Sequence, residues 1–147
     1  MEETGKIFII LFAFGGFLLA SYIRGKKRAE KPLVCPLEGS CEEVVHSRYS
    51  TLFGIPLETW GMLYYGATSI AYAFFLLFPE LTPSFAPYAL LLTSAFAFLL
   101  SMYLTSIQAF FIHHWCTWCL FSAGISTIIF LLGVAILNQN ILLSLLK

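Results

Sequence analysis

Four long apolar runs alternate with shorter polar segments along the chain. We predict a membrane-spanning helix over each of them, at residues 7–23, 57–78, 87–112 and 116–137. Each run is close to the roughly 20 residues that a helix needs to cross a bilayer. Pro79 and Pro83 break the chain between the second and third runs, and the polar residues 138–140 are expected to end the fourth. The pattern predicts an all-α membrane protein, a bundle of four transmembrane helices.

The longest polar stretch, residues 24–56, separates the first two runs and is expected to form a loop. Within it, Ser40 and Glu43 match the Ser-x-x-Glu pattern of a capping box, which predicts a short helix over residues 41–47 lying along the membrane surface. Residues 54–56 are expected to turn the chain into the second span. The first run also resembles a signal peptide, but it continues into basic residues without a cleavage motif, which favours an uncleaved helix.

The overall composition agrees with a membrane protein. Hydrophobic residues make up 59% of the 147 residues and charged residues 11%, whereas a soluble domain averages about 25% charged residues. The mean hydropathy is +0.85. The length suits one transmembrane domain over residues 1–147.

Four cysteines fall in two pairs that the span count places on one face of the membrane. Cys35 and Cys41 lie in the first loop, and Cys116 and Cys119 form a Cys-x-x-Cys at the start of the fourth run. A helix start favours a thiolate, and a spacing of three residues puts both sulfurs on one side, where they can form a reversible disulfide. We expect Cys116 to face the water side and the loop, and Cys119 to face the apolar interior.

Other uses of these residues stay open at this point. The cysteines, together with His46, His113 and His114, could bind zinc, so a four-span Cys/His metal-binding membrane protein is the alternative function. A purely structural pair of disulfides is a further possibility. His113, His114 and Glu58 are also candidates for moving protons.

The basic residues are unevenly placed although the eight basic and eight acidic residues cancel. The side that carries the cysteines holds six of the eight: Arg24, Lys26, Lys27, Arg28, Lys31 and Arg48. Beside an apolar run such a cluster marks membrane orientation or contact with anionic lipid, and we expect no nucleic acid partner. The positive-inside rule predicts that the cysteine face of this cell-membrane protein is cytoplasmic, with an extracytoplasmic face as the alternative.

The order of these motifs carries a family resemblance. Its residues are Cys35-x5-Cys41, Ser47, Tyr49, Gly54-Ile55-Pro56, Gly61, Tyr65 and finally Cys116-Thr-Trp-Cys119. This set resembles the vitamin K epoxide reductase family, most closely its small archaeal or bacterial members without a fused thioredoxin-like domain. The resemblance covers roughly residues 35–65 and the start of the fourth span. The other quinone-linked four-helix disulfide oxidases of bacteria place the Cys-x-x-Cys first, so the order distinguishes the two groups.

The resemblance implies a four-helix bundle around a quinone of the menaquinone or ubiquinone type. It implies a quinone-dependent thiol oxidoreductase that generates protein disulfides. Cys35 would form a mixed disulfide with a thioredoxin-like protein, Cys41 would pass electrons to Cys116, and Cys119 would reduce the quinone. Because the chain ends at Lys147, we expect that partner to be a separate chain.

Several further residues are candidates for quinone contact. Ser47 matches a family serine near the site. Phe111 and Trp115 bracket the Cys-x-x-Cys and could stack on a quinone ring, or they belong to an aromatic belt at the membrane interface. Gln108 shares one face of the third run with two other polar residues; it either bonds a neighbouring helix or reaches a quinone carbonyl.

Two departures from the vertebrate pattern limit the expected chemistry. Ala123 stands where vertebrate members carry a tyrosine, and no asparagine near residues 57–58 matches their quinone-contacting asparagine. These departures argue against epoxide reduction and leave quinone reduction unaffected.

Overall fold

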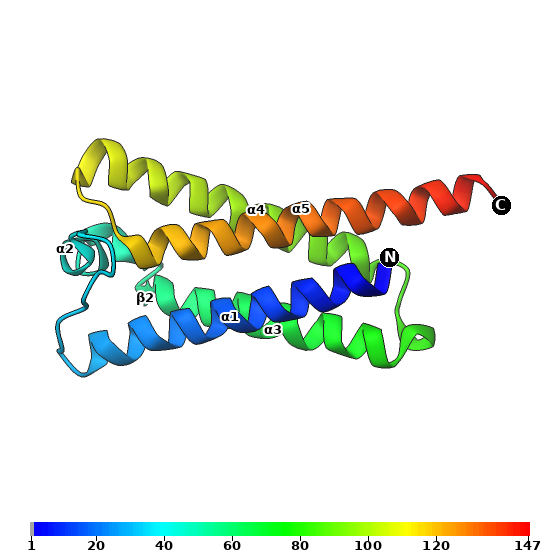
Figure 1. Cartoon of the computed structure of the whole chain (residues 1–147), viewed down its shortest axis with the longest axis horizontal. Coiled ribbons are helices and arrows are strands. Elements are labelled where there is room, and N and C mark those ends of the chain that lie inside the picture. The colour runs from blue at the N-terminus through cyan, green and yellow to red at the C-terminus, as the bar shows by residue number, and fades with distance from the viewer. Residues whose placement is uncertain (1) are drawn as a thin grey trace.

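The computed structural model describes residues 2–147, which fold into four long helices lying side by side (Figure 1). The four are α1 (Glu2–Arg28), α3 (Leu57–Leu77), α4 (Ala86–Ile107) and α5 (Thr117–Leu145). Each is long and apolar enough to cross a membrane. The predicted all-α bundle of four transmembrane helices is confirmed.

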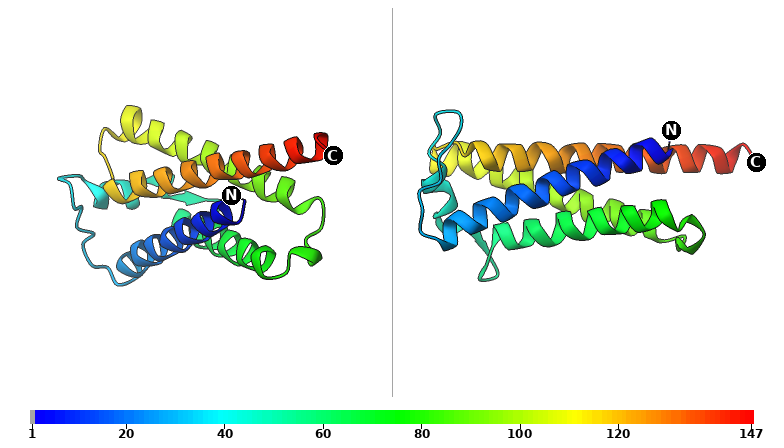
Figure 2. Two further views of the ribbon diagram at one scale, coloured as in Figure 1. Left: turned by 45° about the vertical axis from the view of Figure 1, so that its right-hand side comes forward. Right: turned by 60° about the horizontal axis from the view of Figure 1, so that its bottom comes forward.

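The core of the bundle lies where α1 meets α3 and α5. The two views of Figure 2 show α1 beside both helices, whereas α4 packs mainly against α5. Tyr65 of α3 is central: its ring lies so close to Gly16 of α1 that a Cβ at that glycine would be 2.7 Å from it. The Tyr65 hydroxyl donates to the Ser122 carbonyl of α5 at 2.8 Å. One buried tyrosine therefore contacts helices on both sides of its own, and its hydroxyl makes a hydrogen bond inside the bundle.

The outer surface of the helices is largely apolar. Phe8, Leu92 and Leu131 are examples of large side chains that the bundle leaves exposed. A spanning helix satisfies its backbone groups internally and presents apolar side chains to the lipid. The exposed side chains therefore fit a bilayer as the surrounding solvent.

Some helix ends differ from the prediction. α1 is longer than residues 7–23 at both ends, and α5 continues through residues 138–140 to Leu145 instead of ending at 137. Asn and Gln only weakly disfavour a helix, and unlike proline they keep the backbone donor, so the polar triplet does not end α5. The α-helical part of α4 ends at Ile107 and is followed by a π-helical turn, η3 (Gln108–Ile112).

The polar loop between α1 and α3 contains three short elements. The helix α2 (Cys41–Val45) begins where it was predicted. The Ser40 side chain makes no capping hydrogen bond, so the predicted capping box does not form. A 3-10 turn, η1 (Arg48–Ser50), leads into an antiparallel hairpin of β1 (Thr51–Leu52) and β2 (Ile55–Pro56). The sequence analysis did not foresee these strands, because two residues are too few to show an alternating pattern.

Lys27, in the last turn of α1, holds this loop against α3. Its Nζ donates to the Val45 carbonyl at 2.9 Å, to the Ser50 hydroxyl at 3.4 Å and to Glu58 Oε1 at 3.3 Å. The Glu58 side chain is only 7% exposed and lies in the first turn of α3, where the helix dipole favours a negative charge. The ion pair therefore fixes the end of α1, the end of α2 and the start of α3 together.

Replacing Lys27 with methionine should lower the free energy of unfolding by about 3 kcal/mol, because it leaves the buried Glu58 carboxylate without its counter-charge. Chemical denaturation in detergent measures this loss. Lys26→Met is the matched control. The Lys26 Nζ lies over the Tyr22 ring, 5.7 Å from its centroid, and such a cation–π contact is worth about 0.5–1 kcal/mol. Adding Glu58→Leu to Lys27→Met should recover most of the stability. Equal losses for the two lysine variants would contradict the expectation.

Candidate active site

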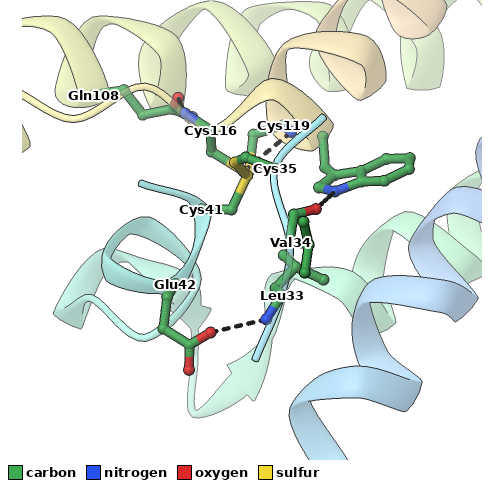
Figure 3. The surroundings of a disulfide bond; sticks show 9 residues. Leu33, Val34, Cys35, Cys41, Glu42, Gln108, Cys116 and Cys119 are labelled. Atoms are coloured by element: carbon green, nitrogen blue, oxygen red, sulfur yellow. Dashed lines mark hydrogen bonds between the residues drawn. A yellow bond between two sulfur atoms is a disulfide. The ribbon is translucent and has the colours of Figure 1, made fainter. Parts of the chain in front are cut away.

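The four cysteines meet at the end of the bundle where α2 lies over the start of α5 (Figures 1 and 3). Cys35 and Cys41 form a disulfide with their Cα atoms 5.8 Å apart, within the usual range for such a bond. Cys116 and Cys119 are free thiols. Cys41 and Cys116 belong to one buried cluster, and Cys35 and Cys119 pack against its margin. The span count correctly predicted that both pairs lie on the same face.

The cysteine loop is fixed to α5 by a small number of contacts. The indole N–H of Trp118 donates to the Val34 carbonyl at 3.0 Å, and the Leu33 N–H donates to Glu42 Oε2 at 2.9 Å. Gly39 lies directly on the head of α5, where a Cβ would be 2.5 Å from the Trp115 carbonyl oxygen. The backbone between the two loop cysteines therefore rests against the residues that precede the Cys-x-x-Cys.

Cys116 is the N-cap of α5, and its surroundings hold it in place. Its sulfur accepts the backbone N–H of Cys119 at 3.3 Å, so it satisfies one of the unpaired donors of the first helical turn. Its own N–H donates to the side-chain carbonyl of Gln108 at 3.2 Å. Cys116 is 0% exposed, so the prediction that it faces the water side is wrong. The loop folds over this sulfur, and Cys41 is the loop cysteine that belongs to the same buried cluster.

These contacts also set the acidity of Cys116. The hydrogen bond from the Cys119 thiol lowers the pKa of Cys116, burial opposes this, and the backbone N–H groups of Cys119 and Trp118 add to the lowering. The net direction is a pKa below that of an ordinary thiol. Because the thiolate is the nucleophile in disulfide exchange, the lowered pKa favours Cys116 as the thiolate of its pair.

A spectroscopic titration can check this acidity. With Cys35 and Cys41 in their disulfide, the ultraviolet thiolate absorbance should appear below pH ~8.5, the pKa of an ordinary thiol. The Cys119→Ala variant should titrate at higher pH, because it removes the largest cause of the lowered pKa. A midpoint at the ordinary value that does not move in this variant would contradict the expectation.

The residues predicted to contact a quinone occupy different kinds of position. Cys119 and Ser47 are half-buried, and the Ser47 hydroxyl donates to the Val44 carbonyl at 2.8 Å. Phe111 is 72% and Trp115 50% exposed, so both rings have free faces. Gln108 is buried, and its carbonyl is engaged by Cys116. Gln108 therefore acts on the site by positioning Cys116.

Two polar residues of α4, which precede Gln108 in the sequence, make hydrogen bonds within the helix bundle. The Ser101 and Ser126 hydroxyls are 2.9 Å apart and join α4 to α5. Thr105 donates to the Ser101 carbonyl of its own helix at 2.8 Å. Hydrogen bonding within and between the helices accounts for both residues.

Sequence reasoning missed the roles of Gly39 and Trp118. For Gly39 the available signal is a glycine inside a short loop between two cysteines, which indicates close backbone approach. For Trp118 the sequence gives no such signal, although a partly buried indole N–H needs an acceptor and often finds it across an interface. Both residues hold the two cysteine pairs together.

The metal-binding alternative finds no support in the geometry. Within residues 2–147, no group of three His, Cys, Asp or Glu side chains is arranged to hold a metal ion. Two of the four sulfurs are bonded to each other. His114 and His46 instead pair with Glu43 and Glu42 at 2.6 and 3.7 Å on the surface.

The comparisons with known proteins give one positive finding. A search of the curated proteins finds no match to this chain. The family model described as the vitamin K epoxide reductase family matches residues 7–134, a range that includes both cysteine pairs and most of the four spans. Because the match covers most of the sequence, the chain belongs to the vitamin K epoxide reductase family.

Proposed function

We propose that this membrane thiol oxidoreductase generates protein disulfides by passing electrons from a thioredoxin-like protein through its two cysteine pairs to a membrane quinone. The observation that carries the proposal is the difference in exposure among the four cysteines of one contiguous cluster. Cys41 and Cys116 are 1% and 0% exposed, whereas Cys35 and Cys119 are both partly open. The cluster has two accessible ends and a sealed centre, as a relay between two different redox partners requires.

The first exchange takes place at Cys35. A thiolate of the partner protein attacks the Cys35 sulfur, the Cys35–Cys41 bond breaks, and Cys41 leaves as a thiolate. The partner's second thiol then attacks its own sulfur in the mixed disulfide and releases Cys35. The partner gains a disulfide, and the loop pair gains two electrons. The partial exposure of Cys35 and the burial of Cys41 favour this order of attack.

The second exchange joins the two pairs. The Cys41 thiolate attacks Cys116 in its disulfide with Cys119, and Cys119 leaves. Cys35 then attacks Cys41 to re-form the loop disulfide, and Cys116 leaves as a thiolate. The hydrogen bonds that lower the pKa of Cys116 favour this departure. The structure has the Cys35–Cys41 disulfide and two free inner thiols, which is the state after this step.

The surroundings of Cys119 fit an apolar oxidant. This half-buried sulfur lies in the first turn of a membrane-spanning helix and packs against an apolar cluster that includes Ile23 and Leu33. A bound quinone would accept two electrons and two protons. We assign the contact with it to Cys119, with the exposed faces of Phe111 and Trp115 and the Ser47 hydroxyl as its candidate surroundings. Cys116 would then close the inner disulfide again.

Turnover in nanodiscs tests the proposal. The purified protein, a reduced thioredoxin-like protein and a menaquinone or ubiquinone analogue should give one quinol for each partner disulfide. When the quinone is left out, no quinol should form. Only the single equivalent of partner that the loop disulfide can oxidise should then form a disulfide. Quinol formation without matching partner oxidation would overturn the proposed electron source.

The charge pattern supports a cytoplasmic active site. Six of the eight basic residues lie on the cysteine side, and only Lys6 and Lys147 lie at the other end. In intact cells, a membrane-impermeant thiol reagent should not modify a cysteine introduced at the exposed Leu37, whereas a permeant reagent should. Ready labelling by the impermeant reagent would place this face outside the cytoplasm.

A further inference from the structure

A pocket of about 290 Å³ lies between the end of α1 and the start of α3, and no cysteine lines it. It is lined by Arg24, Lys27, Arg28, Pro56 and Glu58. Lys27 and Arg28 follow Arg24 by three and four residues, and this spacing puts them on the same face of α1 as Arg24. The volume is at the lower end for a small-molecule site, so it suits a polar headgroup better than a whole lipid.

The charges that line the pocket are only partly used by the protein. Arg24 donates one N–H to the Thr59 hydroxyl at 2.8 Å and retains its other guanidinium donors. Arg28 is exposed and makes no hydrogen bond or ion pair with any residue in the described part of the chain. With Lys27 already paired to Glu58, two guanidinium groups remain to bind an anion. A guanidinium fork is suited to the oxygens of a phosphate.

Glu58 adds a second, independent feature. Its side chain is 7% exposed, Oε1 accepts from Lys27, and Oε2 has no hydrogen-bond partner among residues 2–147. A buried carboxylate oxygen without a donor is costly, so a ligand that offers a hydroxyl or ammonium group there would bind favourably. The pocket thus offers two guanidinium groups for a phosphate and one carboxylate oxygen for a donor.

The position of the pocket indicates where such a ligand comes from. Its cations lie in the last turns of α1, at the end of a helix that is long and apolar enough to cross a membrane. Basic side chains at the end of a span lie at the level of the lipid headgroups. We propose that this pocket binds the phosphate ester of an anionic lipid whose headgroup carries a hydroxyl, with the phosphate on Arg24 and Arg28 and the hydroxyl on Glu58.

Binding there should stabilise the active-site loop. Lys27 lines the pocket and also bonds Val45, the last residue of the helix that begins with Cys41. A ligand that binds only the folded protein raises its stability in proportion to the logarithm of ligand concentration. This inference does not depend on the identity of the oxidant or of the protein partner.

Thermal unfolding in detergent tests the inference. Short-chain phosphatidylglycerol should raise the unfolding midpoint of the full chain by several degrees, and phosphatidylcholine should not. Phosphatidylmethanol, which has the same charge but no headgroup hydroxyl, should bind about tenfold more weakly, because the hydrogen bond to the Glu58 carboxylate is lost. Equal effects of the two anionic lipids would overturn the role of Glu58. An equal shift with water-soluble glycerol phosphate would overturn the assignment to a lipid.

Paired variants separate the pocket from general charge attraction. Arg24→Gln/Arg28→Gln should lose most of the phosphatidylglycerol shift. Lys26→Gln/Lys31→Gln removes the same charge from residues that do not line the pocket, and it should retain the shift. If the double variant does not fold, Arg28→Gln alone replaces it. This side chain is exposed and has no partner among residues 2–147, and its substitution should weaken the shift. Equal losses in the pocket and control variants would overturn the site.

Discussion

Replacing Cys119 with alanine is expected to lower the rate of quinol formation by at least about a thousandfold, as when a covalent nucleophile is removed from an enzyme. Cys119 is the only free thiol of the inner pair that is not fully buried, so it is the group that an oxidant from the bilayer can reach. Without it, Cys116 cannot close a disulfide within its own pair. Quinol absorbance under steady-state conditions measures the effect.

The same variant carries its own control for folding. The Cys35–Cys41 disulfide does not involve Cys119, so reduced partner protein should still be oxidised in a rapid burst of about one equivalent. A lost burst would mean that the variant has not folded, and Cys119→Ser would then replace it. Turnover equal to that of the unaltered protein, with the burst present, would contradict the assignment of Cys119.

Substituting alanine for Gly39 is expected to slow electron transfer between the pairs by about a hundredfold. The new Cβ would lie 2.5 Å from the Trp115 carbonyl oxygen and 3.2 Å from the Cys35 sulfur, and a backbone atom cannot move aside as a flexible side chain can. The loop must therefore shift relative to the head of α5. A displacement of about 1 Å between reacting groups costs on the order of a hundredfold in rate.

Gly124→Ala is the matched control for this substitution. It adds the same methyl group to α5 close to the cysteines, but at a position with nothing within 4 Å. We expect wild-type rates for Gly124→Ala. The protein is first oxidised with quinone so that both disulfides are closed. The rate at which the loop disulfide re-forms after a single equivalent of reductant, followed by rapid quenching and alkylation, then measures the step. If the two variants transfer electrons at the same rate, close approach at Gly39 does not control the relay.

The architecture could be predicted because it depends on signals that persist along the chain. Four apolar runs give four spans, and counting spans puts residues 35–41 and 116–119 on one face without any knowledge of packing. Exact helix ends depend on weaker preferences. The triplet at 138–140 is polar, but it does not prevent α5 from continuing to Leu145.

The environment of the individual site residues could not be predicted in the same way. Helix position alone suggested that Cys116 faces water, whereas its burial results from a loop whose path depends on tertiary contacts such as that between Trp118 and Val34. Gln108 shows the same limit. Its sequence position reveals a polar group on a helix face, but only the fold shows that its carbonyl accepts the Cys116 N–H.

The exchange between the buried sulfurs of Cys41 and Cys116 is the central step of the proposed relay. The Cys35→Ala/Cys119→Ala variant contains only these two cysteines. After mild oxidation, peptide mass spectrometry should find a disulfide between Cys41 and Cys116 within one chain, because both sulfurs belong to the same buried cluster. Two thiols that stay reduced, or that form bonds only between chains, would contradict direct transfer between the pairs.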